Sequence, residues 1–167
     1  LQPPATVVNN KWGKPYDWKW NEVMETKNAN GGAGFTEYND GTIQFETTQW
    51  SQGYYDNGKI WQTFTLPEGK YEMRIEVKNA ANIGSGSTNI HFAVAQGESL
   101  PDNEELEKSD IILSYLKFES EHTNKTSALP IFELTEEKTI TVGWVVSFSD
   151  ICRNIEFKSV RLWSVAE

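Results

Sequence analysis

The feature that most constrains the fold is a strict alternation of apolar and polar residues in several short segments. Residues 71–78 alternate Tyr, Met, Ile and Val with Glu, Arg, Glu and Lys. Successive side chains of a β-strand point to opposite faces, so this pattern predicts a strand with one buried and one solvated face. Residues 90–94 and 140–148 show the same period of two. Residues 111–118 are apolar on both parities, which is typical of a strand covered on both sides.

Turn-forming residues separate these segments. Leu66-Pro67-Glu68-Gly69 predicts a tight turn, and Asp56-Asn57-Gly58 and Asn39-Asp40-Gly41 supply residues that tolerate a positive φ. The apolar parity switches within residues 155–162, which predicts a β-bulge near residues 158–159. One short helix is expected over residues 102–109, after a proline. The fold class is therefore all-β: an antiparallel β-sandwich of about eight or nine strands.

The 167 residues are enough for one domain and too few for two comfortable ones. Residues 1–8 are expected to be a linker, because Pro3 and Pro4 stiffen and extend the chain. Residues 9–167 are expected to form the single sandwich domain. Because the chain starts at Leu1 without a methionine, we expect it to be a processed product or an excised piece.

The net charge of −9 argues against two classes of partner, nucleic acid and anionic membrane surfaces, since both require a cationic footprint. No segment approaches the roughly 20 apolar residues that span a bilayer, so no direct membrane insertion is expected. Cys152 is the only cysteine, which excludes an internal disulfide and a cysteine-based zinc site.

The sequence offers no identifiable catalytic machinery. His91 and His122 are the only histidines, and neither has a metal-ligand spacing. His91 lies on the polar parity of its strand, and we interpret it as a solvated side chain rather than a catalytic base. Paired carboxylates can hydrolyse glycosidic bonds, but none of the 24 acidic residues is singled out as such a pair. We therefore expect a protein that is not an enzyme, with no assignable metal site.

Aromatic residues are the strongest functional signal, at 13% of the chain with seven tryptophans. One cluster lies in polar, glycine-containing sequence at residues 50–57. Aromatic rings beside amides and carboxylates suit a sugar, because a ring covers the C–H bonds while polar groups bind the hydroxyls. We interpret this cluster as a ligand-binding site of rings and polar groups: Trp50, Tyr54, Tyr55, Gln52, Asp56 and Asn57.

A second aromatic cluster contains Trp12, Trp18 and Trp20. Trp18 and Trp20 share one face if the chain is extended, and we favour a core role for them over a ligand-binding role. The three remain candidates of second rank. Trp144 lies among alternating apolar residues and is predicted to be core. Trp61 lies on the non-core parity of its strand, so it is either under a covering loop or on a binding face.

The order of the motifs resembles a known group of domains. The segment Lys59-Ile60-Trp61-Gln62-Thr63-Phe64-Thr65-Leu66-Pro67-Glu68-Gly69-Lys70-Tyr71 is similar to the strand–turn–strand signature of galactose-binding-domain-like modules. Residues 92–102 (FAVAQGESLPD) and 155–162 (IEFKSVRL) resemble a C-terminal domain of unknown function in surface glycan-utilisation lipoproteins of Bacteroidetes. The resemblance spans residues 12–165.

This resemblance implies a galactose-binding-like jelly roll that is exported to the cell surface or periplasm. It further implies upstream domains of the same polypeptide and lipid anchoring through a missing N-terminal segment. Many relatives carry a structural calcium, but no calcium motif is matched residue by residue here, and no other cofactor is expected. The leading hypothesis is a non-catalytic carbohydrate-binding module whose partner is an oligo- or polysaccharide. The alternatives are a structural or protein-interaction domain and a glycoside-active enzyme.

Overall fold

The protein folds into two antiparallel sheets in a computed structural model that describes residues 5–8, 12–15, 17–29, 32–36, 41–47, 54–84 and 86–166. The larger sheet has the order β1 (Ala5–Val8), β2 (Trp12–Pro15), β4 (Ala33–Thr36), β5 (Thr42–Thr47), β13 (Arg153–Val165), β7 (Gly69–Asn79) and β10 (Lys125–Ala128), with β11 (Phe132–Leu134) also paired with β7. The smaller sheet has the order β3 (Lys19–Trp20), β6 (Tyr55–Leu66), β12 (Lys138–Phe148), β8 (Thr88–Gln96) and β9 (Ile112–Lys117).

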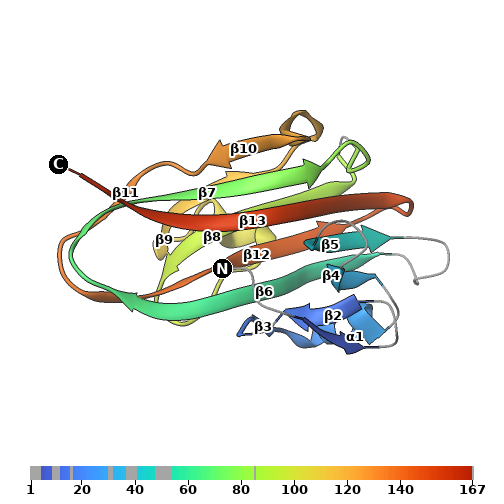
Figure 1. The fold of residues 1–167 in the computed structure, drawn as a ribbon, viewed down its shortest axis with the longest axis horizontal. Coiled ribbons are helices and arrows are strands. Elements are labelled where there is room, and N and C mark those ends of the chain that lie inside the picture. The colour runs from blue at the N-terminus through green and yellow to red at the C-terminus, as the bar shows by residue number, and fades with distance from the viewer. Residues whose placement is uncertain are drawn as a thin grey trace.

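The predicted antiparallel β-sandwich is confirmed. The long strands β6, β7, β12 and β13 run along the longest axis of the molecule (Figure 1). The described strands number thirteen rather than eight or nine. Much of the excess comes from strands of two to four residues, such as β3 and β11, which are too short to show a clear alternation of apolar and polar residues.

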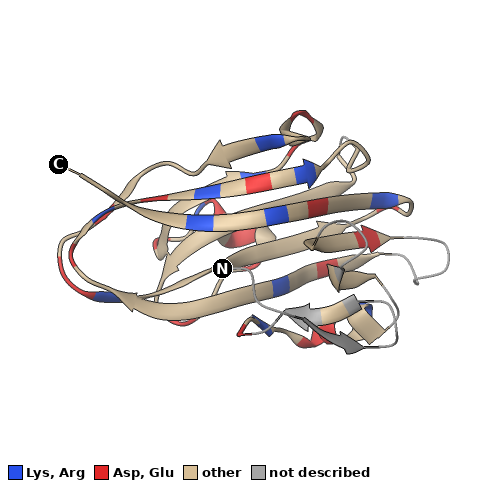
Figure 2. Ribbon diagram, viewed as in Figure 1, with Lys and Arg blue, Asp and Glu red and all other residues tan. Residues whose placement is uncertain are grey.

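The predicted bulge lies in β13. Phe157 pairs with Val77 and Ser159 pairs with Glu76, so Lys158 is the extra residue between two consecutive partners on β7. The insertion moves the following residues to the opposite faces, and Val160 enters the core although Lys158 is exposed. Charged residues alternate along the neighbouring strands β7 and β13 (Figure 2). The switch of apolar parity in the sequence therefore correctly predicted the β-bulge at Lys158.

The main core lies between the sheets and is centred on Trp144 of β12, which is 1% exposed as predicted. The centroid of its indole lies 5.0 Å from the ring of Phe92, 5.1 Å from that of Trp18 and 5.2 Å from that of Phe157. Phe92 comes from the smaller sheet and Phe157 from the larger one, so one indole joins both layers.

A second apolar cluster covers the outer face of the smaller sheet. Ala93, Ala95 and Val145 pack there against Leu100 and Leu106, which belong to the segment that connects β8 to β9. Trp61 packs against this cluster, so it lies under a covering segment, which was one of the two expected alternatives. Strand β12 is therefore buried on both faces, as its run of buried residues shows.

Gly143 of β12 is required by close packing on this strand. A Cβ atom at Gly143 would lie 2.1 Å from the carbonyl oxygen of Ile60 and 2.7 Å from the Cα of Trp61. Neither backbone atom can move independently, so no side chain fits between β12 and β6 at this point.

The predicted linker 1–8 differs from the structure. Ala5–Val8 form β1, which pairs with β2 through partners such as Thr6 and Lys14, whereas residues 1–4 lie outside the described part of the chain. The physical reason is that Thr6, Val7 and Val8 are β-branched and favour an extended, paired strand.

The helices also differ from the expectation. The helix predicted over residues 102–109 is shorter, since α2 spans Asn103–Leu106, and a 3₁₀-helix η1 spans Ser120–His122. Helix α1 (Glu22–Ala29) was not predicted, because its buried side is formed by Met24, Lys27 and Asn28 and is only partly apolar. Its start did carry a signal: the Asn21 side-chain oxygen accepts the backbone N–H of Met24 at 3.2 Å, as an N-cap residue does.

Candidate functional site

The two described rings of the predicted cluster at residues 50–57 have opposite environments. Tyr54 is 66% exposed, the most open large apolar side chain of the described residues. Tyr55 is 8% exposed and its ring centroid lies 5.3 Å from that of Phe148 in the core. Tyr55 is therefore a core residue rather than the stacking platform that the sequence predicted. Trp50 and Gln52 lie outside the described residues.

The two described polar residues of the cluster, Asp56 and Asn57, also have different environments. Asp56 is exposed, whereas Asn57 belongs to the backbone of a bulge in β6 and has φ 53°. The Asn57 side-chain oxygen accepts the backbone N–H of Asn103 at 2.8 Å, and its own backbone N–H donates to Ser147 Oγ at 2.9 Å. Asn57 thus holds α2 on the sheet, which corrects its predicted role as a ligand for sugar hydroxyls.

The second aromatic cluster contributes to the core. Trp18 is 3% exposed, and Trp20 is half-buried against the core while its Nε1 donates to a carboxylate oxygen of Glu25. Both observations agree with the core role that the sequence favoured. Trp12 begins β2, but its side chain lies outside the described residues.

His91 does not have the solvated environment that the sequence predicted for it. It is 1% exposed rather than solvated, because the segment carrying α2 covers the outer face of β8. Its Nδ1 lies 2.8 Å from Asn103 Oδ1 and its Nε2 lies 3.1 Å from Glu107 Oε1. Asn103 also donates through Nδ2 to Asn89 O at 2.8 Å and to Ser147 Oγ at 2.7 Å. These contacts fix α2 and leave His91 closed to a substrate.

An open pocket does form beside Tyr54, between α1 and the start of β6. It has a volume of about 430 Å³, and we call it the α1–β6 pocket; it is lined by Glu22, Val23, Thr26, Lys27, Tyr54, Tyr55 and Asp56. Sequence reasoning placed Tyr54 and Asp56 together but missed the helix that completes the site. Asn21, followed by Glu22 and Glu25, was the available signal of a capped helix start.

The floor of the α1–β6 pocket is formed by two buried polar residues. The Lys27 Nζ lies 4.9 Å from the centroid of the Tyr55 ring, in a cation–π contact. Burial lowers the pKa of Lys27, and burial together with the negative charge of Glu46 raises the pKa of Tyr55. Within the described part of the chain, the Tyr55 hydroxyl has no hydrogen-bond partner.

The α1–β6 pocket therefore combines an exposed phenol ring with hydrogen-bonding groups. Tyr54 offers a flat apolar face, Glu22 and Asp56 are carboxylates that accept hydrogen bonds, and the Thr26 hydroxyl donates and accepts. Among the described residues, no group of three or more His, Cys, Asp or Glu side chains is placed so that it could hold a metal ion.

Comparison with known proteins shows the family and the fold. The profile of a family described as "Domain of unknown function (DUF5013)" matches residues 2–143, and the chain belongs to this family. A search of curated protein sequences finds no match.

Among solved structures, the chain is similar to TmCBM61 in complex with beta-1,4-galactotriose, with a TM-score of 0.52, 12% identity and coverage of 95% of this chain and 97% of that chain. It is also similar to the K3 cleaved adhesin domain of Lys-gingipain from Porphyromonas gingivalis W83, with a TM-score of 0.52, 13% identity and coverage of 90% and 93%. The architecture is thus a sandwich of the kind found in carbohydrate-binding modules, a galactose-binding-like fold.

Proposed function

We propose that this domain is a non-catalytic carbohydrate-binding module and that its α1–β6 pocket binds a glycan. The observation that carries the proposal is Tyr54, a ring 66% exposed at the rim of an open pocket that also presents Asp56, Glu22 and Thr26. A ring exposed to this extent adds nothing to the core, so its apolar face is available to a ligand.

The proposed binding mode assigns one role to each group. The Tyr54 ring stacks on the C–H face of a pyranose, and the carboxylates of Asp56 and Glu22 accept hydrogen bonds from hydroxyls. Trp50 and Gln52, which precede Tyr54 in the chain, remain predicted members of the same site. Affinity at a single site is expected to be weak, because an open pocket leaves much of the sugar hydrated.

The similarity to TmCBM61, a structure with bound galactotriose, supports a glycan as the ligand class. We further propose that the domain is exported and anchored at the cell surface through upstream parts of the same polypeptide, as the family resemblance implies. In the described residues, no helix has the length and apolar character needed to cross a membrane.

A structural or protein-interaction domain is the second candidate function. The burial of Trp18, Tyr55 and Trp144 favours it, since these rings stabilise the sandwich and are closed to a ligand. The exposed Tyr54 and the α1–β6 pocket favour the glycan-binding function, because neither is needed for packing.

The test is a calorimetric titration of a panel of neutral oligosaccharides, starting with β-1,4-galactotriose, into the wild-type domain and Tyr54→Ala. Loss of the stacked ring is expected to weaken binding by roughly five- to tenfold, equivalent to about 1–1.4 kcal/mol. Tyr54→Phe keeps the ring and should bind as the wild type does. Ile131→Ala removes a comparably exposed side chain (53% exposed) and serves as the matched control.

Unchanged affinity of Tyr54→Ala would remove the α1–β6 pocket as the site. Absence of binding to every oligosaccharide in the panel would instead favour the structural role.

A further inference from the structure

We propose a second binding site, in a groove between the two sheets, that takes an acidic sugar residue, a hexuronic acid. The groove has a volume of about 500 Å³ and is lined by Gln62, Phe64, Val160, Arg161, Leu162 and Trp163. It shares no residue with the α1–β6 pocket. The inference rests on the proposed function only in taking a glycan as the ligand class.

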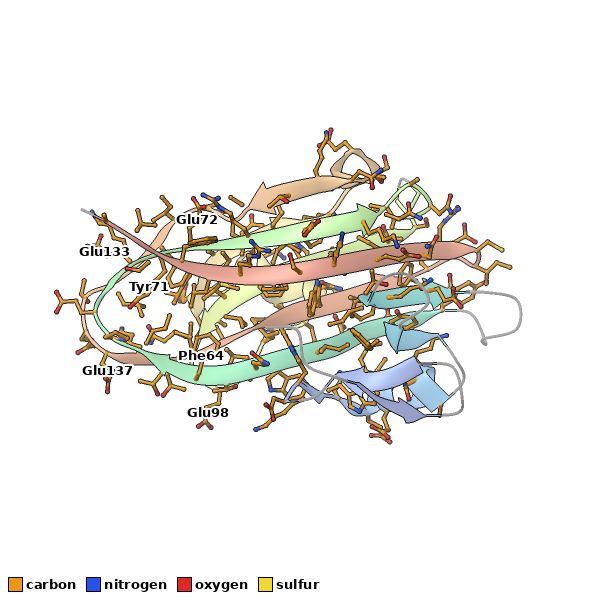
Figure 3. All side chains as sticks on the ribbon, viewed as in Figure 1. Phe64, Tyr71, Glu72, Glu98, Glu133 and Glu137 are labelled. Atoms are coloured by element: carbon orange, nitrogen blue, oxygen red, sulfur yellow. The ribbon has the colours of Figure 1, made fainter. Side chains whose placement is uncertain are left out.

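The groove exists because two strands lose a neighbour at the same end of the sandwich. Strand β6 has β12 on one side, and on its other side β3 pairs only with Ile60 and Trp61. Strand β13 has β7 on one side, and on its other side β5 pairs only with residues 153–157. Among the described strands, none pairs with residues 62–66 or 158–165 on those sides. Figure 3 shows Phe64 on β6 at the end of the sandwich that also carries Tyr71 and Glu72 of β7.

The apolar part of the groove combines core and surface residues. Val160 is 4% exposed, and Phe64 and Leu162 pack partly buried against the core, so they form a fixed apolar floor. Trp163 is 46% exposed, and the guanidinium of Arg74 lies 5.7 Å from its ring centroid. This cation–π contact orients the indole while nearly half of the side chain stays open to solvent.

Two polar side chains that line the same groove have no side-chain partner in the described part of the chain. Gln62 shares the inward parity of Ile60 and Phe64, so it is an amide placed where the strand otherwise carries apolar residues. Among the described residues, Gln62 makes no side-chain hydrogen bond and Arg161 makes no ion pair. The groove is therefore lined by an amide, a guanidinium and an indole, which are groups that recognise hydroxyls, a carboxylate and the C–H face of a sugar ring.

The charge on Arg161 specifies an acidic ligand. Arg161 pairs directly opposite Arg74 across β13 and β7, and like charges in that register repel. Arg74 is neutralised by its ion pair with Glu72, whereas Arg161 has no such partner in the described part of the chain. A bound carboxylate would accept two parallel hydrogen bonds from the Arg161 guanidinium and supply the counter-charge that Arg161 lacks among the described residues. A pyranose that carries a carboxylate is a hexuronic acid.

The test uses two pairs of ligands that differ only in charge: the trimers of galacturonic and glucuronic acid and their fully methyl-esterified forms. Calorimetric titration of the wild type should show at least about tenfold tighter binding of one acid than of its ester. The preference should shrink as NaCl is raised, because salt screens the ion pair at the open groove. Arg161→Gln should abolish the preference, and Arg161→Lys should retain part of it. Lys108→Gln removes an equal charge from an exposed position outside the groove and should leave the preference intact.

Two results would overturn the inference: equal affinity for acid and ester in both pairs, or an acid preference that survives in Arg161→Gln. A preference lost in Tyr54→Ala but kept in Arg161→Gln would also overturn it, because it would place the acid in the α1–β6 pocket. Neutral oligosaccharides that bind in a Tyr54-dependent manner, with no acid preference, would contradict this inference and leave the proposed function standing.

Discussion

The two halves of the sandwich differ in the strand neighbours of β6 and β13 and in the roles of the polar side chains Asn57, Lys59 and Gln62 on β6. In the closed half, which we define as residues 55–61 of β6 and 153–157 of β13, each strand gains a second neighbour: β3 pairs with Ile60 and Trp61 of β6, and β5 pairs with residues 153–157 of β13. In the open half, residues 62–66 and 158–165, each strand is paired on one side only among the described strands. Strand β6 passes through both halves, so the polar side chains of its residues 55–61 can be compared with those of its residues 62–66 in a single strand.

Polar side chains of the closed half of β6 are used to hold the fold. The Lys59 Nζ donates to the carbonyl oxygen of Leu100 at 2.8 Å and lies 2.7 Å from Asp102 Oδ1, and Asn57 binds the backbone of Asn103. In the open half, Gln62 has no side-chain partner among the described residues. The difference shows that composition alone does not distinguish a polar side chain that holds the fold from one that has no side-chain partner among the described residues.

The largest effect is expected for Asn103→Ala, which removes the centre of the polar network in the closed half. Asn89 O, Ser147 Oγ and the His91 Nδ1 would each lose a hydrogen bond in a buried site. Urea denaturation should show a loss of about 2–4 kcal/mol in the free energy of unfolding. Glu105→Ala, at an exposed position of the same helix, is the matched control. A loss below about 1 kcal/mol for Asn103→Ala would show that the Asn103 side chain is not what holds α2 on the sheet.

Gln62→Ala should have a smaller effect on stability and a clear effect on binding. Because Gln62 is half-buried and has no side-chain hydrogen bond to a described residue, the free energy of unfolding is expected to stay within about 0.5 kcal/mol of the wild type. Affinity for the acidic trimer that the wild type binds should fall several-fold in calorimetric titration. A destabilisation above about 1.5 kcal/mol, with binding intact, would make Gln62 a structural residue like Asn57.

The smallest effect concerns Glu156 in the closed half of β13. Burial raises the pKa of this carboxyl; the positive charge of Lys78 opposes that shift, and the negative charge of Glu46 adds to it. With a raised pKa the folded state holds the proton more tightly than the unfolded chain does. Stability is therefore lost as pH rises from the ordinary glutamate value through the folded pKa, and the loss persists above it.

Glu156→Gln keeps the shape and removes the charge, so the variant should be slightly more stable than the wild type at about pH 7. The advantage should disappear at about pH 4, where the folded wild type is protonated. Urea denaturation at the two pH values measures the difference. An advantage of equal size at both would attribute the effect to packing rather than to ionisation.

Local sequence patterns predicted those features that depend only on neighbours along the chain. The period of two in residues 71–78 predicted β7, and the parity switch in residues 155–162 predicted the bulge at Lys158. Trp144 was predicted to be core because both of its strand neighbours of the same parity are apolar. The same bulge places Trp163 on the exposed parity, so the sequence held a signal for this residue that was not used.

Features that depend on contacts between distant segments were not predictable in this way. Tyr54 and Tyr55 are adjacent and chemically alike, yet Tyr54 is exposed and Tyr55, the first residue of β6, is core, so the packing around each ring sets its exposure. His91 lies on the polar parity of β8, but the segment carrying α2 covers it. The groove at Gln62 arises from two strand edges, which no single stretch of sequence describes.

The sequence by itself determined the fold class, the course of the long strands, the bulge and the indole at the centre of the core, since alternation and turn residues act over a few positions. Only the tertiary structure decided which polar and aromatic side chains are available to a ligand. The physical reason is that exposure of a side chain is set by what packs over it, and the covering segments, α1 over β6 and α2 over β8, come from elsewhere in the chain.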